Sequence, residues 1–143
     1  KNLPTFSPEI LKIISCTDPM KSKHLDKALR QFAEEGLTSL FKTLIGSKWL
    51  IGVIGKLQID VLKSRIETEY GLPIIYEDTK FMTARWLLGE RKLLDEFISK
   101  NRDQIAIDYD GAEVFLPRIQ WDIDKVKADF PKIELKTVKD FIL

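Results

Sequence analysis

The stretch GVIGKLQIDVLKSRIETEYGLPIIYE, residues 52–77, decides the fold class of this 143-residue chain. An apolar strand passes through Gly55 into an amphipathic helix, which is predicted over residues 58–70. Gly71 suits the end of that helix, because glycine tolerates the left-handed backbone found there. A second apolar strand then follows at residues 73–77. The stretch therefore predicts a strand-helix-strand unit of an α+β protein.

A glycine and a lysine before a helix also suggest a phosphate-binding loop at Gly55 and Lys56. A P-loop requires the spacing GxxxxGK followed by serine or threonine, so that amides surround the phosphate and the hydroxyl reaches magnesium. Here the glycines at 52 and 55 are too close together, and Leu57 takes the hydroxyl position. We therefore expect Gly52 to permit close packing in a strand and Gly55 to permit a sharp turn.

The rest of the chain repeats this alternation of strands and helices. Further helices are predicted from Asp18 to Gly36, and over residues 90–101 and 122–130. Strands are predicted at residues 6–15, 40–45, 49–54, 80–88, 105–109, 112–117 and 133–137. The order is β-α-β-β-α-β, the ferredoxin-like split βαβ pattern, followed by a second α+β half with the same order. We expect one domain over residues 1–143, with possible halves at 1–78 and 79–143.

Composition excludes several functional classes. The 23 basic residues nearly balance the 22 acidic ones, so net charge does not indicate nucleic-acid binding. One cysteine, Cys16, excludes an intrachain disulfide, and one histidine, His24, leaves no metal-ligand set of the usual spacing. No apolar run approaches the roughly 20 residues of a membrane helix. The chain begins at Lys1 without a methionine, which suggests a fragment of a longer protein.

Individual side chains give no catalytic set. We expect His24 to be solvated, Cys16 to be a small buried residue, and the three tryptophans to lie mostly in the core. These tryptophans are Trp49, Trp86 and Trp121. Asp108, Asp110 and Glu113 do not match the spacing of a calcium loop, and a charged turn explains them better. A basic cluster could contact phosphates, although a solvated helix face is the simpler interpretation; it comprises Lys12, Lys21, Lys23, Lys27 and Arg30.

The chain resembles a known family in its motifs. SPEILKIISCTDPMKSKHLDKALRQFAEEG, the stretch at residues 52–77, and TARWL at residues 83–87 are similar to the C-terminal domain of bacterial peptide chain release factor three. The similarity covers roughly residues 5–135. The first half is more distantly similar to domain III of elongation factor G. Gln58 stands where elongation factors and ribosome-protection proteins are expected to have histidine, which favours the release-factor branch. Lys56, the charges of the first helix and the tail KTVKDFIL depart from the family pattern.

The resemblance implies a non-catalytic domain of a translational GTPase that recycles class I release factors in termination, in the cytoplasm. GTP and magnesium would be held by another domain, with no cofactor or metal in this fragment. Expected partners are the ribosome, at small-subunit protein S12 and nearby rRNA, and the parent's own GTPase and barrel domains. The fragment is expected to be monomeric and away from membranes. Candidate ribosome contacts are Lys21, Lys23, Lys27, Lys56, Lys63 and Arg65.

Three alternatives stay open. The chain could belong to another translational GTPase, either elongation factor G-like or a ribosome-protection protein. It could instead be a small ferredoxin-like enzyme of the acylphosphatase type, for which Arg118 and the Lys56 turn are the available anion-binding groups. A free-standing regulatory ligand-binding domain is a third reading, which gene context would distinguish.

Overall fold

The structure is a computed structural model that describes residues 5–139. The helices are α1 (Ser22–Glu34), α2 (Lys56–Tyr70), α3 (Arg91–Lys100) and α4 (Gln120–Asp129), with 3-10 turns η1 (Pro19–Lys21) and η2 (Arg102–Gln104). The strands are β1 (Thr5–Phe6), β2 (Ile10–Cys16), β3 (Ser39–Thr43), β4 (Trp49–Val53), β5 (Ile74–Asp78), β6 (Arg85–Leu88), β7 (Ile105–Asp108), β8 (Glu113–Phe115), β9 (Glu134–Lys136) and β10 (Val138–Lys139). The predicted α+β class is confirmed.

The chain forms two consecutive β-α-β-β-α-β units. The first unit runs from β2 to β5 and the second from β6 to β9. They share one antiparallel eight-stranded sheet with the order β5-β2-β4-β3-β7-β8-β6-β9. Each half has the same internal order, in which the unit's first strand lies between its third and fourth. The ferredoxin-like pattern is therefore present twice, although the two halves share no obvious sequence repeat. Whether they divide the chain into domain halves stays a prediction.

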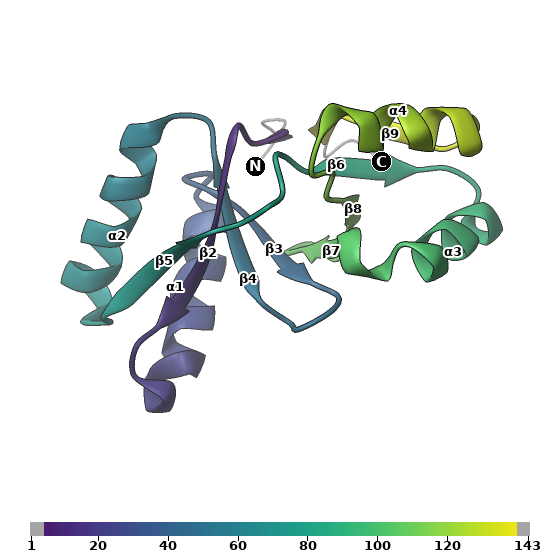
Figure 1. Cartoon of the computed structure of the whole chain (residues 1–143). Helices are drawn as coiled ribbons and strands as arrows, with labels where there is room; N and C mark the ends of the chain where they lie inside the picture. The colour runs from purple at the N-terminus through teal and green to yellow at the C-terminus, as the bar shows by residue number, and fades with distance from the viewer. Residues whose placement is uncertain (1–4, 140–143) are drawn as a thin grey trace.

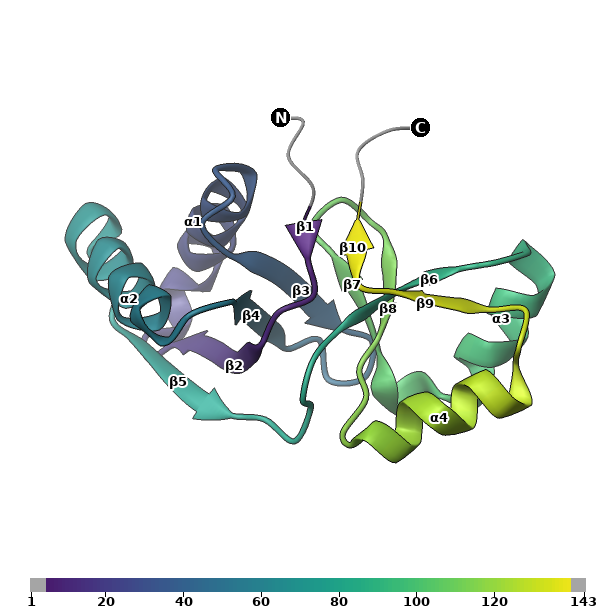
Figure 2. The same ribbon diagram turned by 90° about the horizontal axis from the view of Figure 1, so that it is seen from above.

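The shared sheet bends so that the helix-free faces of the two units pack on each other. The units join where β3 pairs with β7, with Phe41 opposite Asp108. A core cluster beneath this junction contains Leu11 and Leu50 from the first unit, together with Trp86 from the second. Helices α1 and α2 cover the outer face of one unit, and α3 and α4 cover the outer face of the other (Figures 1 and 2). The result is a layered sandwich. The two halves of the sheet pack on each other in the middle, and a pair of helices covers each outer face.

The glycines of residues 52–77 serve backbone geometry as predicted. A Cβ on Gly52 would lie 2.7 Å from the Cβ of Pro8, so no larger residue fits in this strand without movement. Gly55 precedes α2, and the backbone amides of Ile54 and Gly55 both donate to Oε1 of Gln58, at 3.0 and 2.9 Å. These amides therefore already have an acceptor, which leaves them poorly suited to cradle a phosphate.

Some predicted boundaries were wrong. Residues 80–84 belong to no strand, and β6 begins only at Arg85. This segment bonds to loops instead of a neighbouring strand, because Thr83 Oγ1 donates to the Pro8 carbonyl at 2.7 Å and the Met82 amide donates to the Pro117 carbonyl at 2.8 Å. The predicted strand at residues 6–15 also divides into β1 and β2. Part of the divergent tail, residues 140–143, lies outside the described residues.

The tryptophan prediction holds for two of the three residues. Trp49 and Trp86 are 8% and 5% exposed, and both belong to core clusters. Trp121 is 60% exposed, so its predicted core role was wrong. It lies in the first turn of α4, whose buried side is formed by Ile123 and Val126 instead.

Candidate functional site

The main cationic feature of the first unit is a basic face on α1. Lys23, Lys27 and Arg30 are exposed and spaced four and three residues apart, which places them on one side of the helix. The opposite side of α1 is buried in the core of the first unit. Lys21 lies just before this helix, in η1, and is also exposed. Three of the six predicted contact residues are therefore on or beside this face.

One end of the basic face is held in place by Trp49. The Arg30 guanidinium carbon lies 5.4 Å from the centre of the indole ring, and Lys42 Nζ of β3 lies 4.7 Å from it. The indole Nε1 donates to Asp26 Oδ1 at 2.6 Å, which fixes the ring against α1. Two cations from different elements thus meet on one buried aromatic side chain.

The other three predicted contact residues lie on α2. Lys56 is exposed at its start and Lys63 is half-buried. Arg65 bonds to Glu69 at 2.7 Å and to Glu35 at 3.2 Å, and its guanidinium lies 4.7 Å from the ring centre of Phe32. The hydrogen bond to Glu69 is the main cause of the raised pKa of Arg65. Arg65 therefore ties α2 to α1, and its charge is already matched by carboxylates.

The structure does not gather all six candidates into one patch. Helices α1 and α2 run in opposite directions across the sheet (Figure 1). Lys21 and Lys23 lie at the beginning of α1, which is 13 residues or about 20 Å long. Lys56 lies near the other end of α1. Its chain neighbours Ile54 and Gln58 line the same groove as Glu35 and Gly36, which follow α1.

Lys12, the remaining member of the basic cluster, is on β2 and pairs with Asp78 of β5. It therefore does not contribute to the basic face of α1.

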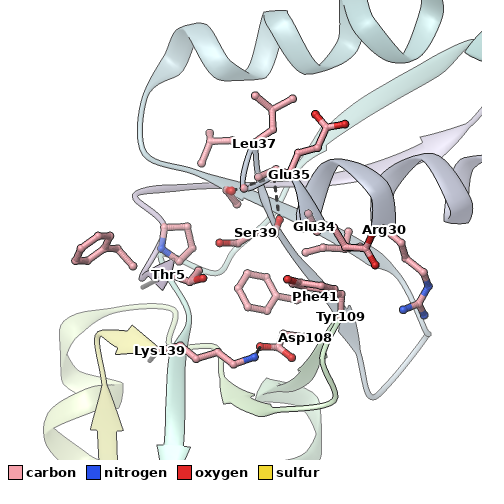
Figure 3. A pocket seen from close by; sticks show the side chains of 18 of the residues that line it. Thr5, Arg30, Glu34, Glu35, Leu37, Ser39, Phe41, Asp108, Tyr109 and Lys139 are labelled. Carbon is pink, nitrogen blue, oxygen red and sulfur yellow. Dashed lines mark hydrogen bonds and ion pairs between the residues drawn. The ribbon is translucent and has the colours of Figure 1, made fainter. Parts of the chain in front are cut away.

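A groove of about 870 Å³ lies at the seam between the two units. We call it the seam groove; its walls come from the end of α1, from β1, β3, β4 and β10, and from the β7–β8 turn (Figure 3). Lys27 and Arg30 of the basic face are among its lining residues, and Phe41 and Asp108 lie deeper in it. The basic face thus borders a largely apolar groove.

Asp108 is the most highly connected polar group in this groove, and its side chain is only 5% exposed. Its Oδ1 accepts from the amides of Asp110 and Ala112, at 2.9 Å each. Its Oδ2 accepts from Trp86 Nε1 at 3.0 Å and from Lys139 Nζ at 2.7 Å. Asp108 therefore holds together β6, the β7–β8 turn and β10.

Lys139 reinforces this connection by also binding Asp110, at 2.9 Å. Burial alone would lower the pKa of the Lys139 ammonium, but its hydrogen bonds to the two carboxylates raise it. Sequence reasoning placed Asp108 only in a charged turn and missed its burial. An aspartate shortly before a turn often accepts hydrogen bonds from the backbone amides of that turn. The position of Asp108 before Asp110-Gly111 is therefore a sequence signal for this role.

The residues considered for catalysis are not brought together. His24 is exposed on α1, and Cys16 is half-buried against the core of the first unit. Arg118 precedes α4 in the second unit and bonds to Asp122, whereas Lys56 begins α2 in the first unit. The geometry therefore offers no paired anion site of the acylphosphatase type from these two residues.

Among residues 5–139, no group of three or more histidine, cysteine or acidic residues is arranged to hold a metal ion. The described helices also include none that is long and apolar enough to cross a membrane.

Comparison with known families gives a match over most of the chain. The family model for the class II release factor RF3, C-terminal domain, matches residues 1–127 of the 143. The match includes the whole first unit, the seam groove except for β10, and most of α4.

Proposed function

This chain belongs to the family of the class II release factor RF3 C-terminal domain, and from that membership we propose that it contacts the ribosome through the basic face of α1. The family associates the chain with translation termination and protein biosynthesis. The observation that carries the more specific proposal is the row of Lys23, Lys27 and Arg30 on one exposed helix side. Lysine and arginine side chains are the main ligands for RNA phosphates.

We rank the candidate contact residues by their exposure and by the partners that they already have. Lys21, Lys23 and Lys27 are exposed and form the primary contact set, to which we add Arg30. Lys56 and Lys63 form a second, weaker set, because they lie on α2 and away from the start of α1. Arg65 is assigned a structural role, since Glu35 and Glu69 already bind it.

The proposed partner surface is protein S12 of the small subunit together with the rRNA around it. In the parent protein, GTP and magnesium would be bound by a separate GTPase domain, and this chain would act as a non-catalytic lever in the cytoplasm. Two units with one continuous sheet and one shared core suit that role, because packed cores move as units instead of deforming continuously. The parent would dissociate class I release factors after peptide release.

The proposal is tested by measuring binding of the chain to purified small ribosomal subunits at several salt concentrations. The test variant is Lys23→Gln/Lys27→Gln/Arg30→Gln. The matched control carries the same number of charge removals on the second unit, at the exposed Lys92, Lys100 and Lys127. Each lost phosphate contact reduces the slope of log affinity against log salt by roughly 0.7–0.9.

We expect the α1 variant to bind more weakly and with a slope reduced by about 2–3, and the control to resemble the unmodified chain. Circular dichroism of the α1 variant checks that loss of the Arg30–Trp49 contact leaves the fold intact. Equal binding by the α1 variant and the unmodified chain would reject the basic face. Calorimetry with GTP separately tests the assignment of nucleotide binding to another domain, since heat of binding to this chain would contradict it.

A further inference from the structure

A short strap runs along one side of the seam groove. It consists of residues 137–139 and contains β10, which pairs with β1 in a separate two-stranded sheet. Thr5, Phe6 and Lys139 from these two strands line the groove. Figure 3 shows the Lys139 side chain extending toward Asp108. The strap therefore borders the groove without belonging to the eight-stranded sheet.

The strap has few of the interactions that stabilise the rest of the fold. Strands β1 and β10 are two residues long each, and none of their four side chains is fully buried; Phe6 is 55% exposed. A two-stranded ribbon alone is only marginally stable in water. Segments with few buried apolar groups open locally, at free energies below that of global unfolding. Thr137, which joins β9 to β10, is exposed and can serve as the hinge.

Lys139 fastens the strap to the groove, yet Asp108 does not depend on it for hydrogen bonds. The Lys139 ammonium binds Asp108 and Asp110, at 2.7 and 2.9 Å. Without that ammonium, Asp108 still accepts from Trp86 Nε1 at 3.0 Å and from two turn amides at 2.9 Å each. The released ammonium would be solvated by water. Release of Lys139 thus avoids the large cost of leaving a buried carboxylate without a partner.

The two units keep their other connections when the strap opens. Strand β3 pairs with β7, and the shared core cluster of Leu11, Leu50 and Trp86 does not include the strap. On the other side of the small sheet, Ser7 Oγ donates to the Ala84 carbonyl at 2.6 Å. This bond holds the end of β1 against the second unit. Strand β10 is therefore the strand that moves.

We infer that the strap is a lid on the seam groove, fastened by Lys139, which opens locally while both units stay folded. Opening separates β10 from β1 and gives solvent access to Phe41 and Trp86, which are 0% and 5% exposed in the closed state. The family match covers residues 1–127, so it includes these two groove residues but not the strap. Access to a groove within the matched domain is thus controlled by a segment outside the match.

Amide hydrogen exchange measured by NMR tests the local opening. The reporter is the Ser7 amide, which donates to the Thr137 carbonyl at 2.7 Å when the strap is closed. The reference amides are those of β4, which lies between β2 and β3 in the large sheet. The variants are Lys139→Met and Gln58→Ala, with Lys136→Met as the matched control at an exposed position of β9. Gln58 caps the start of α2, and this cap is kept when only the strap opens.

We expect the Ser7 amide to be protected roughly 100-fold less than β4, and its exchange to be insensitive to low concentrations of urea. Gln58→Ala should accelerate exchange in β4 about fivefold and leave Ser7 unchanged, because the cap is lost only on global unfolding. Lys139→Met should accelerate both about tenfold or more, because the ion pair is lost in either kind of opening. Lys136→Met should change neither. Equal protection of Ser7 and β4, faster Ser7 exchange in Gln58→Ala, or unchanged Ser7 exchange in Lys139→Met would overturn the inference.

Thiol labelling tests whether the strap covers the groove. In a Cys16→Ser background, Ser39→Cys places a thiol on β3 among the residues that line the groove. We expect Lys139→Met to raise the rate of labelling by a bulky maleimide by the same factor as the exchange of Ser7, and Lys136→Met to leave it unchanged. An unchanged labelling rate in Lys139→Met would show that the strap does not close the groove, and would overturn its role as a lid.

Discussion

Removing the Asp108 carboxylate should strongly destabilise the fold. In Asp108→Ala, the Trp86 indole and the Lys139 ammonium lose a buried acceptor, and two backbone amides of the β7–β8 turn lose theirs. Breaking a buried ion pair by removing one partner costs about 3–5 kcal/mol. Lys139 keeps Asp110 as a partner, so the loss here comes mainly from the unpaired Trp86 indole and the two turn amides. Domains are typically stable by only about 5–15 kcal/mol, so this loss is a large share of the total. At about 3 °C per kcal/mol, the melting temperature should fall by roughly 10–15 °C.

The assay is urea unfolding followed by circular dichroism, with Asp110→Ala as the control. Asp110 also binds Lys139, at 2.9 Å, but its side chain is 39% exposed, so its removal should cost about 1 kcal/mol or less. The Trp86 indole resonance in a proton–nitrogen NMR spectrum should shift only in Asp108→Ala, while that of Trp49 stays in place. A loss below about 1 kcal/mol, or equal losses in the two variants, would refute the central position of Asp108.

Three other predictions follow from packing, capping and titration. Gly52→Ala should lower the free energy of unfolding by about 1–3 kcal/mol, because the added Cβ would overlap Pro8. Gly55→Ala should be tolerated far better, since the nearest atom to its added Cβ is at 3.9 Å. Gln58→Ala should cost about 1 kcal/mol in urea unfolding, because two amides of the turn before α2 lose their acceptor; no loss would contradict this cap. Burial alone would raise the pKa of Asp122, but hydrogen bonds to donors around it lower the pKa below its usual value. Asp122→Ala should therefore cost about 1.5–3 kcal/mol at pH 7. The part of this cost that depends on the ionised carboxylate should be lost as the pH falls through the folded pKa, so the difference should shrink, whereas a constant difference down to pH 2 would contradict it.

Local sequence patterns were sufficient to predict most of the secondary structure. The period of apolar residues and the glycine at position 71 predicted α2, and the Asp110-Gly111 pair predicted the β7–β8 hairpin, in which Gly111 has a φ of 90°. The close packing of Gly52 was also predicted correctly. These features depend on residues near one another in the chain, which is why the sequence reveals them.

The remaining features depend on contacts between distant segments. The joining of β3 to β7 brings Phe41 and Asp108 together, and no short pattern predicts it. Burial of Asp108 depends on Lys139, which lies 31 residues away. The three tryptophans are expected mostly in the core because each adjoins the start of a strand or helix, yet the buried side of α4 is completed by Ile123 and Val126 without Trp121.

The basic face illustrates the same division. The helix and its exposed lysines were predictable from periodicity, whereas the anchoring of Arg30 and Lys42 on Trp49 was not. The ion pairs of Arg65 with Glu69 and Glu35 divide in the same way. The contact with Glu69 follows from helical spacing, but the one with Glu35 requires the packing of α2 on α1.

The most direct test of the proposed ribosome contact is hydroxyl-radical probing from an iron chelate on α1. The chain's single cysteine is replaced by Cys16→Ser, and a new attachment point is introduced by His24→Cys on the basic side of the molecule or by Ser99→Cys on α3 as the control. Both positions are exposed, so either chelate can be attached without disturbing the core. We predict strong cleavage of small-subunit rRNA from position 24 and weaker cleavage from position 99. Absence of rRNA cleavage from position 24 in a chain that still binds the ribosome would contradict the proposal.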